Sequence, residues 1–236
     1  MSQLGGNSIF LSPDDSQLGR GEPIEDTARV LSGMVEAVVV RTASHQRIQT
    51  FAEYSSIPII NGLTDDYHPC QLLADVLTIV EKFGTVQGKF AAWIGDGNNV
   101  CHSWINASKQ FDFQLRISTP PGYEPDPKLV AQSDGHAELV ESPQLAAEQS
   151  NIVVTDTWAS MGQEDQKEQR LDSFAGYRVE QTLMAKAHEK AIFMHCLPAY
   201  RGLEVAAEVI DGPQSVVWTQ AENRLHAQKA LLESLL

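Results

Sequence analysis

The stretch His68-Pro69-Cys70-Gln71 opens the helix around which the chain is organised. After it, apolar residues recur at helical spacing on one face: Leu72, Leu73, Val76, Leu77 and Val80. Proline suits the first helical position because its missing N–H needs no partner there. His68 and Gln71 therefore stand at a helix N-terminus, which readily takes an anion. The stretch predicts a site for a small, planar, phosphorylated substrate; the alternative is an ordinary helix with a capping histidine.

Short apolar runs alternate with helical patterns on both sides of this helix. Strands are expected at residues 8–11, 37–40, 57–60, 90–94, 114–118, 137–140, 151–155, 191–194 and 215–218. The run at 37–40 is continuously β-branched, as in a strand buried on both faces. Helices are expected between them, including residues 179–188, and an amphipathic helix closes the chain at 221–236. This order predicts two parallel α/β units joined by the helix that begins after His68.

Composition excludes several function classes. The chain has 236 residues, 42% hydrophobic and 20% charged, as in an ordinary globular protein of one or two domains. Its net charge of −14 argues against a general nucleic-acid or anionic-membrane surface. Three cysteines are too few and too scattered for a disulfide framework, so a reducing cytoplasm is expected. We find no secretory pattern and no apolar run near the roughly 20 residues of a membrane span.

Ligands of open α/β sheets bind beyond the carboxyl ends of the strands. Polar candidates recur there: Arg41, His68, Asn99, Asp156 and Cys196. Each alone also has a structural explanation, since a cysteine such as Cys196 is often a small buried hydrophobe and Arg224 often a solvated charge. Gly95-Asp96-Gly97 matches half of a dinucleotide fingerprint, but Val100 stands where the third glycine belongs, so nucleotide binding has little support.

Five motifs taken in order resemble a known family. They are His68-Pro-Cys-Gln71, Gly95-Asp-Gly-Asn-Asn99, Asp156-Thr-Trp-Ala-Ser160-Met161-Gly-Gln-Glu164, His195-Cys196-Leu-Pro198 and Ala221-Glu-Asn-Arg224. The set resembles the ornithine carbamoyltransferase branch of the aspartate/ornithine transcarbamoylase family, from the first residue to the last. His-Pro-x-Gln is shared by the wider family. The Asp156 and His195 motifs are the ones that distinguish ornithine from aspartate as acceptor.

The resemblance implies a carbamoyl-phosphate site, whose residues would be Arg41, His68, Gln71, Arg224, Leu197 and Gln17. Arginine forks suit phosphate oxygens. His68 would donate to the carbamoyl oxygen as it gains negative charge, and Gln71 would accept from the carbamoyl amide. Backbone carbonyls around Leu197 would hold the carbamoyl nitrogen. Gln17 matches a loop residue that reaches the neighbouring subunit's site, so a homotrimer or a multiple of trimers is expected.

The resemblance also implies an ornithine site, whose residues would be Asn99, Asp156, Ser160 and Met161. Asp156 would face the α-ammonium and Asn99 the α-carboxylate, with Cys196 beside the attacking δ-amine. The implied catalytic residues are Cys196, His68 and Asp156. No metal or organic cofactor is implied, and no nucleic-acid or membrane partner. The reaction would be carbamoyl transfer from carbamoyl phosphate to L-ornithine, giving L-citrulline and phosphate, in arginine biosynthesis or catabolism.

The resemblance divides the chain into three parts. Residues 1–83 would bind carbamoyl phosphate, residues 84–220 would bind ornithine, and residues 221–236 would form a helix that returns to the first domain. The family also carries an earlier Ser-Thr-Arg-Thr phosphate loop that has no match here. The first domain is therefore expected to be incomplete at its N-terminus. Two alternatives remain: a transcarbamoylase for a modified ornithine or a diamine, and an inactive paralogue or fragment that binds an amino acid or a partner protein.

Overall fold

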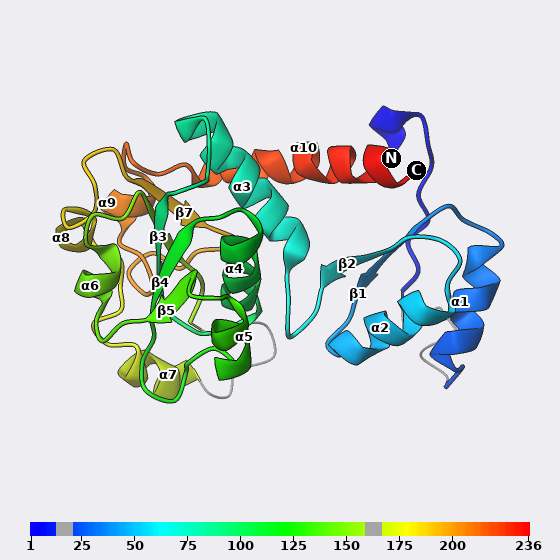
Figure 1. Ribbon diagram of the computed structural model, residues 1–236, viewed down its shortest axis with the longest axis horizontal. Helices are drawn as coiled ribbons and strands as arrows, with labels where there is room; N and C mark the ends of the chain where they lie inside the picture. Colours follow the sequence, from blue (N-terminus) through cyan, green and yellow to red (C-terminus); the bar gives the residue numbers. More distant parts are fainter. Residues whose placement is uncertain (13–20, 159–166) are drawn as a thin grey trace.

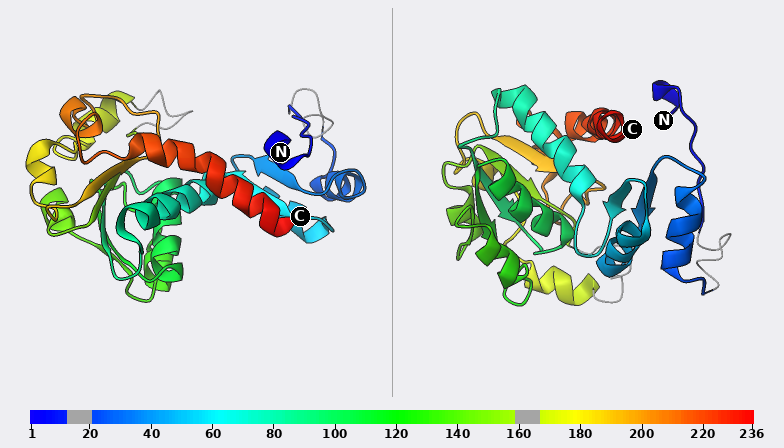
Figure 2. Two further views of the ribbon diagram at one scale, coloured as in Figure 1. Left: turned by 90° about the horizontal axis from the view of Figure 1, so that it is seen from above. Right: turned by 45° about the vertical axis from the view of Figure 1, so that its right-hand side comes forward.

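The computed structural model describes residues 1–12, 21–158 and 167–236 (Figure 1). Two parallel sheets lie on either side of a packed pair of helices, α3 (Pro69–Phe83) and α10 (Val217–Leu235). Figure 2 shows α10 as a long rod that runs from the larger sheet toward the smaller one. The predicted fold class is confirmed, because both sheets are parallel and the C-terminal helix packs on the central one.

The large unit, residues 90–210, is built on a five-stranded sheet in the order β5-β4-β3-β6-β7. Its strands are β3 (Phe90–Ile94), β4 (Gln114–Ser118), β5 (Ala137–Leu139), β6 (Ile152–Thr155) and β7 (Ile192–His195). Its helices are α4 (Asn99–Gln110), α5 (Pro127–Gln132), α6 (Pro143–Ala147), α7 (Lys167–Ser173), α8 (Gln181–Met184) and α9 (Ala207–Ile210). Strand order reverses between β3 and β6, and ligands of such sheets bind at this switch point.

The large sheet has an apolar cluster on each face, so its strands are buried on both sides. Trp93 and Val154 belong to the cluster shared with α3 and α4. The alternate residues Ile94 and Val153 belong to the cluster shared with α6, α8 and α9. Successive side chains of a strand point to opposite faces, which explains why these runs read as continuously apolar in the sequence.

The small unit, residues 24–63, has two parallel strands, β1 (Val38–Arg41) and β2 (Ile59–Leu63), with α1 (Ile24–Ser32) and α2 (His45–Tyr54). The α2 helix packs on β2, and α1 packs on α2. The predicted burial of 37–40 on both faces is wrong, because β1 alternates and Val39 is 61% exposed. A two-stranded sheet with helices on one side leaves its other face open in the described part of the chain.

Three other expectations are corrected. Residues 8–11 form no strand in the described structure, and Ile9 and Phe10 are 80% and 89% exposed. Instead of a last strand at 215–218, Ser215 forms a single bridge to Phe193 and α10 begins at Val217. The helix expected at 179–188 shrinks to α8, because Val179 bridges to Val205. Short apolar runs thus resemble strands in the sequence even where the structure forms no strand, as at 8–11, or begins a helix, as at 215–218.

No helix in the described part of the chain combines the length and the apolar character that crossing a membrane requires. A short 3-10 turn, η1 (Ser2–Leu4), stands at the start of the chain.

Candidate active site

The N-terminus of α3 lies against α4 of the large unit. His68 is the N-cap of α3 and Pro69 occupies the first helical position, as the sequence predicts. The His68 backbone N–H donates to Ser103 Oγ at 2.7 Å, and Ser103 Oγ in turn donates to the Asn99 carbonyl at 2.8 Å. The start of α3 is therefore fixed relative to the loop that follows β3.

The His68 side chain is a neutral imidazole at physiological pH. Burial lowers its pKa to about 4, with further lowering by Arg224 and Arg41, while Asp156 acts in the opposite direction. His68 is only 7% exposed, and its buried Nδ1 has no hydrogen-bond partner within the described residues. Two arginines and a carboxylate thus lie within electrostatic reach of an imidazole whose ring nitrogen remains available to a ligand.

Gln71 makes one hydrogen bond to α10 and one within α3. Its Oε1 accepts from Arg224 Nη1 at 3.0 Å, and its Nε2 donates to Asp75 Oδ1 at 2.8 Å. Gln71 and Asp75 are fully buried. The arginine from the last helix is thereby held beside the first turn of α3, where the helix N-terminus also favours negative charge.

Asp156 and Cys196 meet at the carboxyl edge of the large sheet. Asp156 follows β6 and Cys196 follows β7, and Cys196 Sγ donates to Asp156 Oδ1 at 2.9 Å. Burial and the Asp156 charge raise the pKa of the Cys196 thiol well above its usual range. The thiol is therefore protonated at neutral pH and is a poor nucleophile.

Asn98, which the sequence reasoning missed, completes this cluster. Its Nδ2 donates to Asp156 Oδ2 at 2.8 Å, while its Oδ1 caps α4 by accepting from the N–H groups of Val100 and Cys101. The neighbouring Asn99, which the sequence did single out, donates instead to the Thr64 carbonyl at 2.7 Å. A capping asparagine directly after a strand and before a helix is the signal that would have found Asn98.

The second glycine of the motif between β3 and α4 is explained by packing. A Cβ on Gly97 would lie 2.3 Å from the Pro125 nitrogen, and the Gly97 N–H donates to the Tyr123 carbonyl. Only a residue without a side chain allows this close approach of two backbones. The half-fingerprint at Gly95-Asp96-Gly97 thus has a structural cause that involves no nucleotide.

A buried histidine and glutamate lie beneath Cys196. His195 Nδ1 accepts from the Leu197 N–H at 2.9 Å, so the ring proton sits on Nε2, which lies 3.3 Å from Glu204 Oε1. Leu197 has a φ of 58°, an uncommon value for a residue with a side chain. Sequence reasoning missed Glu204, since a lone acid six residues after a motif carries no periodic signal.

Asp156, His195 and Cys196 are the one group of three potential metal ligands found among the described residues, with ligand atoms within 4.8 Å of one another. Cys196 already donates to Asp156, and its raised pKa disfavours the thiolate that a metal would need. His195 Nδ1 is engaged by the Leu197 N–H. These atoms are better explained as a hydrogen-bond cluster than as a metal centre.

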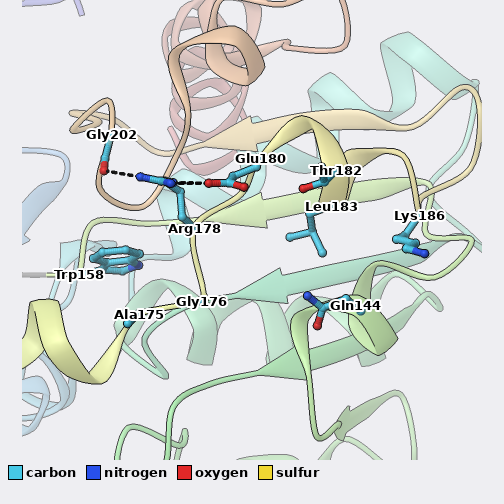
Figure 3. Close-up of a pocket in the computed structure, with 10 residues that line it drawn as sticks. All are labelled: Gln144, Trp158, Ala175, Gly176, Arg178, Glu180, Thr182, Leu183, Lys186 and Gly202. Carbon is cyan, nitrogen blue, oxygen red and sulfur yellow. Dashed lines mark hydrogen bonds and ion pairs between the residues drawn. The ribbon is translucent and has the colours of Figure 1, made fainter.

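A large cavity of about 630 Å³ lies elsewhere in the large unit (Figure 3). In it Arg178 donates to the Gly202 carbonyl at 3.0 Å and to Glu180, whereas Leu183 and Lys186 line another part. Of its lining residues, Trp158 belongs to the motif that begins at Asp156, but none is a residue singled out as a ligand or catalytic group. The candidate site is thus defined by converging side chains and does not coincide with this cavity.

The structure brings most of the predicted residues into two adjoining groups. His68, Gln71 and Arg224 form one group, with Arg41 exposed at the end of β1 but within electrostatic reach of His68. Asp156 and Cys196 form the other, with Leu197 beside them. Asn99 lies next to this second group, at the same sheet edge. Gln17, Ser160 and Met161 lie outside the described residues.

Two protein-family models match the chain. Residues 1–81 match the model described as "Aspartate/ornithine carbamoyltransferase, carbamoyl-P binding domain". Residues 87–235 match the model described as "Aspartate/ornithine carbamoyltransferase, Asp/Orn binding domain". The boundary between the two matches falls at the end of α3.

Individual relatives agree with these models. The ornithine carbamoyltransferase of Nitrosococcus oceani is 61% identical over the whole chain, which covers 78% of that protein, and the one of Methylococcus capsulatus is 58% identical, with 79% covered. Among solved structures, ornithine carbamoyltransferase from Burkholderia thailandensis superposes with a TM-score of 0.91 at 50% identity, and the one from Pyrococcus furiosus with 0.93 at 48%. In both, all of this chain corresponds to 77% of the relative.

Proposed function

Because the chain belongs to the aspartate/ornithine carbamoyltransferase family, we propose that it transfers the carbamoyl group of carbamoyl phosphate to the δ-amine of L-ornithine, releasing L-citrulline and phosphate. The observation that carries the proposal is the surroundings of His68, whose pKa is lowered by the charges of Arg224 and Arg41 and raised by the charge of Asp156. An anionic donor and a cationic acceptor can therefore meet at one imidazole.

On the donor side, Arg41 and Arg224 bind the phosphate, for which guanidinium groups offer paired donors. Neutral His68 donates to the carbamoyl oxygen, where negative charge develops when the amine attacks. Gln71 Oε1 and the Leu197 carbonyl accept from the carbamoyl NH2. The low pKa of His68 supports this role, because a phosphate group nearby favours the protonated ring. A pKa of about 4 opposes that effect and favours the neutral imidazole.

On the acceptor side, Asp156 binds the α-ammonium of ornithine and Asn99 its α-carboxylate, with Ser160 and Met161 as further ligands. The δ-amine must be neutral to attack, and with a pKa of roughly 10.4, as in lysine, only a small fraction is neutral at pH 7. Much of the acceleration then comes from holding the neutral amine in line with the carbamoyl carbon.

The catalytic role of Cys196 is to border the amine without forming a bond to the carbamoyl group. Its raised pKa and its hydrogen bond to Asp156 support this role. We expect Cys196→Ser to retain turnover within about tenfold, which corresponds to about 1.4 kcal/mol. Mass spectrometry of the quenched reaction would contradict this if it trapped a carbamoyl thioester on Cys196.

The division of labour follows the two halves of the chain. We infer that residues 1–83 bind carbamoyl phosphate, that residues 84–220 bind ornithine, and that residues 221–236 tie the two together through α10. The matched ranges 1–81 and 87–235 and the packing of α10 on α3 support this division. A homotrimer is proposed as the assembly, which sedimentation analysis would test. All three cysteines are free thiols, which supports a cytoplasmic location.

The deciding experiment measures citrulline and phosphate from carbamoyl phosphate and L-ornithine. We expect stoichiometric formation of both, strongly reduced by Arg224→Gln and by Asp156→Asn. The acceptor should be tested alongside L-aspartate, N-acetyl-L-ornithine and putrescine, and ornithine should give the highest kcat/KM. Binding of ornithine without any citrulline would favour an inactive relative instead, and a preference for N-acetylornithine would move the assignment to a modified substrate.

A further inference from the structure

The buried carboxylate of Asp75 connects the two halves of the site. Asp75 lies on the second turn of α3 and is 1% exposed. Its Oδ1 accepts two hydrogen bonds, from Gln71 Nε2 at 2.8 Å and from Gln220 Nε2 at 2.7 Å. Gln220 belongs to α10, so the carboxylate lies at the packed face between the two central helices.

Each glutamine also makes a hydrogen bond to one half of the site. Gln71 Oε1 accepts from Arg224 Nη1 at 3.0 Å, on the side of the anion. Gln220 Oε1 accepts from the backbone N–H of His195 at 2.9 Å, directly before Cys196. Hydrogen bonds thus connect five residues on α3, α10 and β7 in one continuous series: Arg224, Gln71, Asp75, Gln220 and His195.

The Asp75 carboxylate determines how the two glutamine carboxamides are oriented. A carboxylate only accepts hydrogen bonds, so both carboxamides must turn their NH2 ends toward Asp75. Their oxygens are then presented outward, one to the Arg224 guanidinium and the other to the His195 N–H. An apolar residue at this position would leave two buried NH2 groups unpaired and would leave both carboxamides free to rotate.

We propose that Asp75 is a positioning residue for carbamoyl transfer, which orients the Gln71–Arg224 pair on the donor side and the backbone that carries Cys196 on the acceptor side. The inference rests on the proposed function and names a residue that acts through others. Burial raises the pKa of Asp75 to about 6, while hydrogen bonds from Gln71 and Gln220 oppose that shift, so the group is mostly ionised at pH 7.5.

The test compares three substitutions in the full chain at pH 7.5. Asp75→Leu removes the acceptor and should lower kcat/KM for carbamoyl phosphate at least 100-fold. Asp75→Asn keeps an oxygen that can accept the hydrogen bonds from Gln71 and Gln220, so kcat/KM should stay within about fivefold. Thr78→Val is the matched control, because Thr78 Oγ1 is a buried acceptor on α3 for Asn223 of α10, one turn further from the site.

Thr78→Val should lower the melting temperature but leave kcat/KM within twofold. A purely structural tie between α3 and α10 predicts the opposite pattern, in which Asp75→Leu and Thr78→Val change kcat/KM alike. That result would overturn the proposal, as would a folded Asp75→Leu with kcat/KM within threefold of the parent, or an Asp75→Asn as impaired as Asp75→Leu.

Gln220→Met provides a second route if Asp75→Leu does not fold. It removes the contact to His195 and one of the two hydrogen bonds to Asp75, but keeps the hydrogen bonds of Gln71 to Asp75 and Arg224. Turnover should fall at least tenfold while the affinity for inorganic phosphate, measured by calorimetry, stays within twofold; unchanged turnover would contradict the proposal.

Phosphate binding also separates this inference from the proposed function. If the parent protein forms no citrulline, the proposed function fails, but phosphate affinity still reports on Arg224. It should then drop at least tenfold in Asp75→Leu and stay within twofold in Thr78→Val. Equal affinities in both variants would overturn the role of Asp75 independently of catalysis.

Discussion

The large and small units bury their sheets differently. All four residues of β6 in the large unit are buried, whereas β1 in the small unit alternates between half-buried and exposed residues. Both described apolar clusters are formed by residues that follow Leu72 or include it, and neither contains a residue of the small unit. Buried apolar area contributes roughly 25 cal/mol per Å², so the large unit has much the greater source of stability.

This difference corresponds to the way each unit supplies its site residues. Asp156 and Cys196 directly follow buried strands, and Asp156 accepts hydrogen bonds from both Asn98 and Cys196. Arg41 stands at the exposed end of a two-stranded sheet. The acceptor side of the site is therefore fixed by the core beneath it, while the donor side relies on α3 and α10 to bring Arg224 to His68.

The largest expected effect is a loss of unfolding free energy in the core of the large unit. Phe193→Ala removes a fully buried side chain of β7 and should lower the free energy of unfolding by about 3–5 kcal/mol. Three of the four tryptophans, at residues 93, 104 and 158, lie in the large unit, and the fourth, at residue 218, lies in α10. None lies in the small unit, so tryptophan fluorescence during urea denaturation reports on the unfolding of the large unit and α10. The midpoint should shift strongly to lower urea.

Phe51→Ala is the counterpart in α2 of the small unit, where Phe51 is also buried. We expect it to speed amide hydrogen exchange in residues 24–63 while leaving the tryptophan-detected midpoint nearly unchanged, because the small unit opens locally. A shift of that midpoint as large as the one from Phe193→Ala would mean that the two units share a single cooperative core.

A second test concerns His68, which lies between the units. Its pKa of about 4 is below the ordinary 6.5, so the unfolded state binds a proton in this interval and the folded state does not. Its contribution to stability is therefore present above pH 6.5 and is lost as the pH falls through 4. Relative to His68→Gln, the parent protein should lose about 3 kcal/mol of unfolding free energy over this range.

An NMR titration of His68 measures the same shift directly, with an expected midpoint near pH 4. Arg41→Gln should raise this midpoint, since the Arg41 charge contributes to the lowering. The Arg41 effect should be smaller than that of Arg224→Gln, because Arg224 is the larger of the two charge contributions. A midpoint near 6.5 in the parent protein would show that His68 is not enclosed as described.

The smallest expected effect compares one helix cap from each unit. Asn98→Ala removes the side chain that caps α4 and should cost about 1 kcal/mol of unfolding free energy. Ser44→Ala in the small unit should cost only a few tenths, because the Ser44 side chain makes no cap hydrogen bond to α2 in the described structure. Thermal denaturation of both variants checks the contrast; equal losses would indicate that Ser44 caps α2 in solution.

Local patterns were sufficient to predict much of the fold. The helix after His68 begins at Pro69 and ends at Gly84 as its apolar spacing and its glycine indicate, and the strands of the large sheet lie where continuous apolar runs occur. Two of the wrong strand predictions arose where a run found no partner strand along its length. Residues 8–11 and 215–218 have strand-like composition, but pairing depends on neighbours that are remote in sequence.

The alternating α/β order, the helix that begins at Pro69, and the motif residues His68, Asp156 and Cys196 can be predicted from the sequence, because turn chemistry, periodicity and residue type are local properties. The contact of Asn98 with Asp156 and the approach of Glu204 to His195 are visible only in the folded molecule. The same holds for Gln71 and Gln220, almost 150 positions apart, which share Asp75. Such contacts follow from how helices and strands pack, and packing brings together residues whose separation in the chain gives no signal of their proximity.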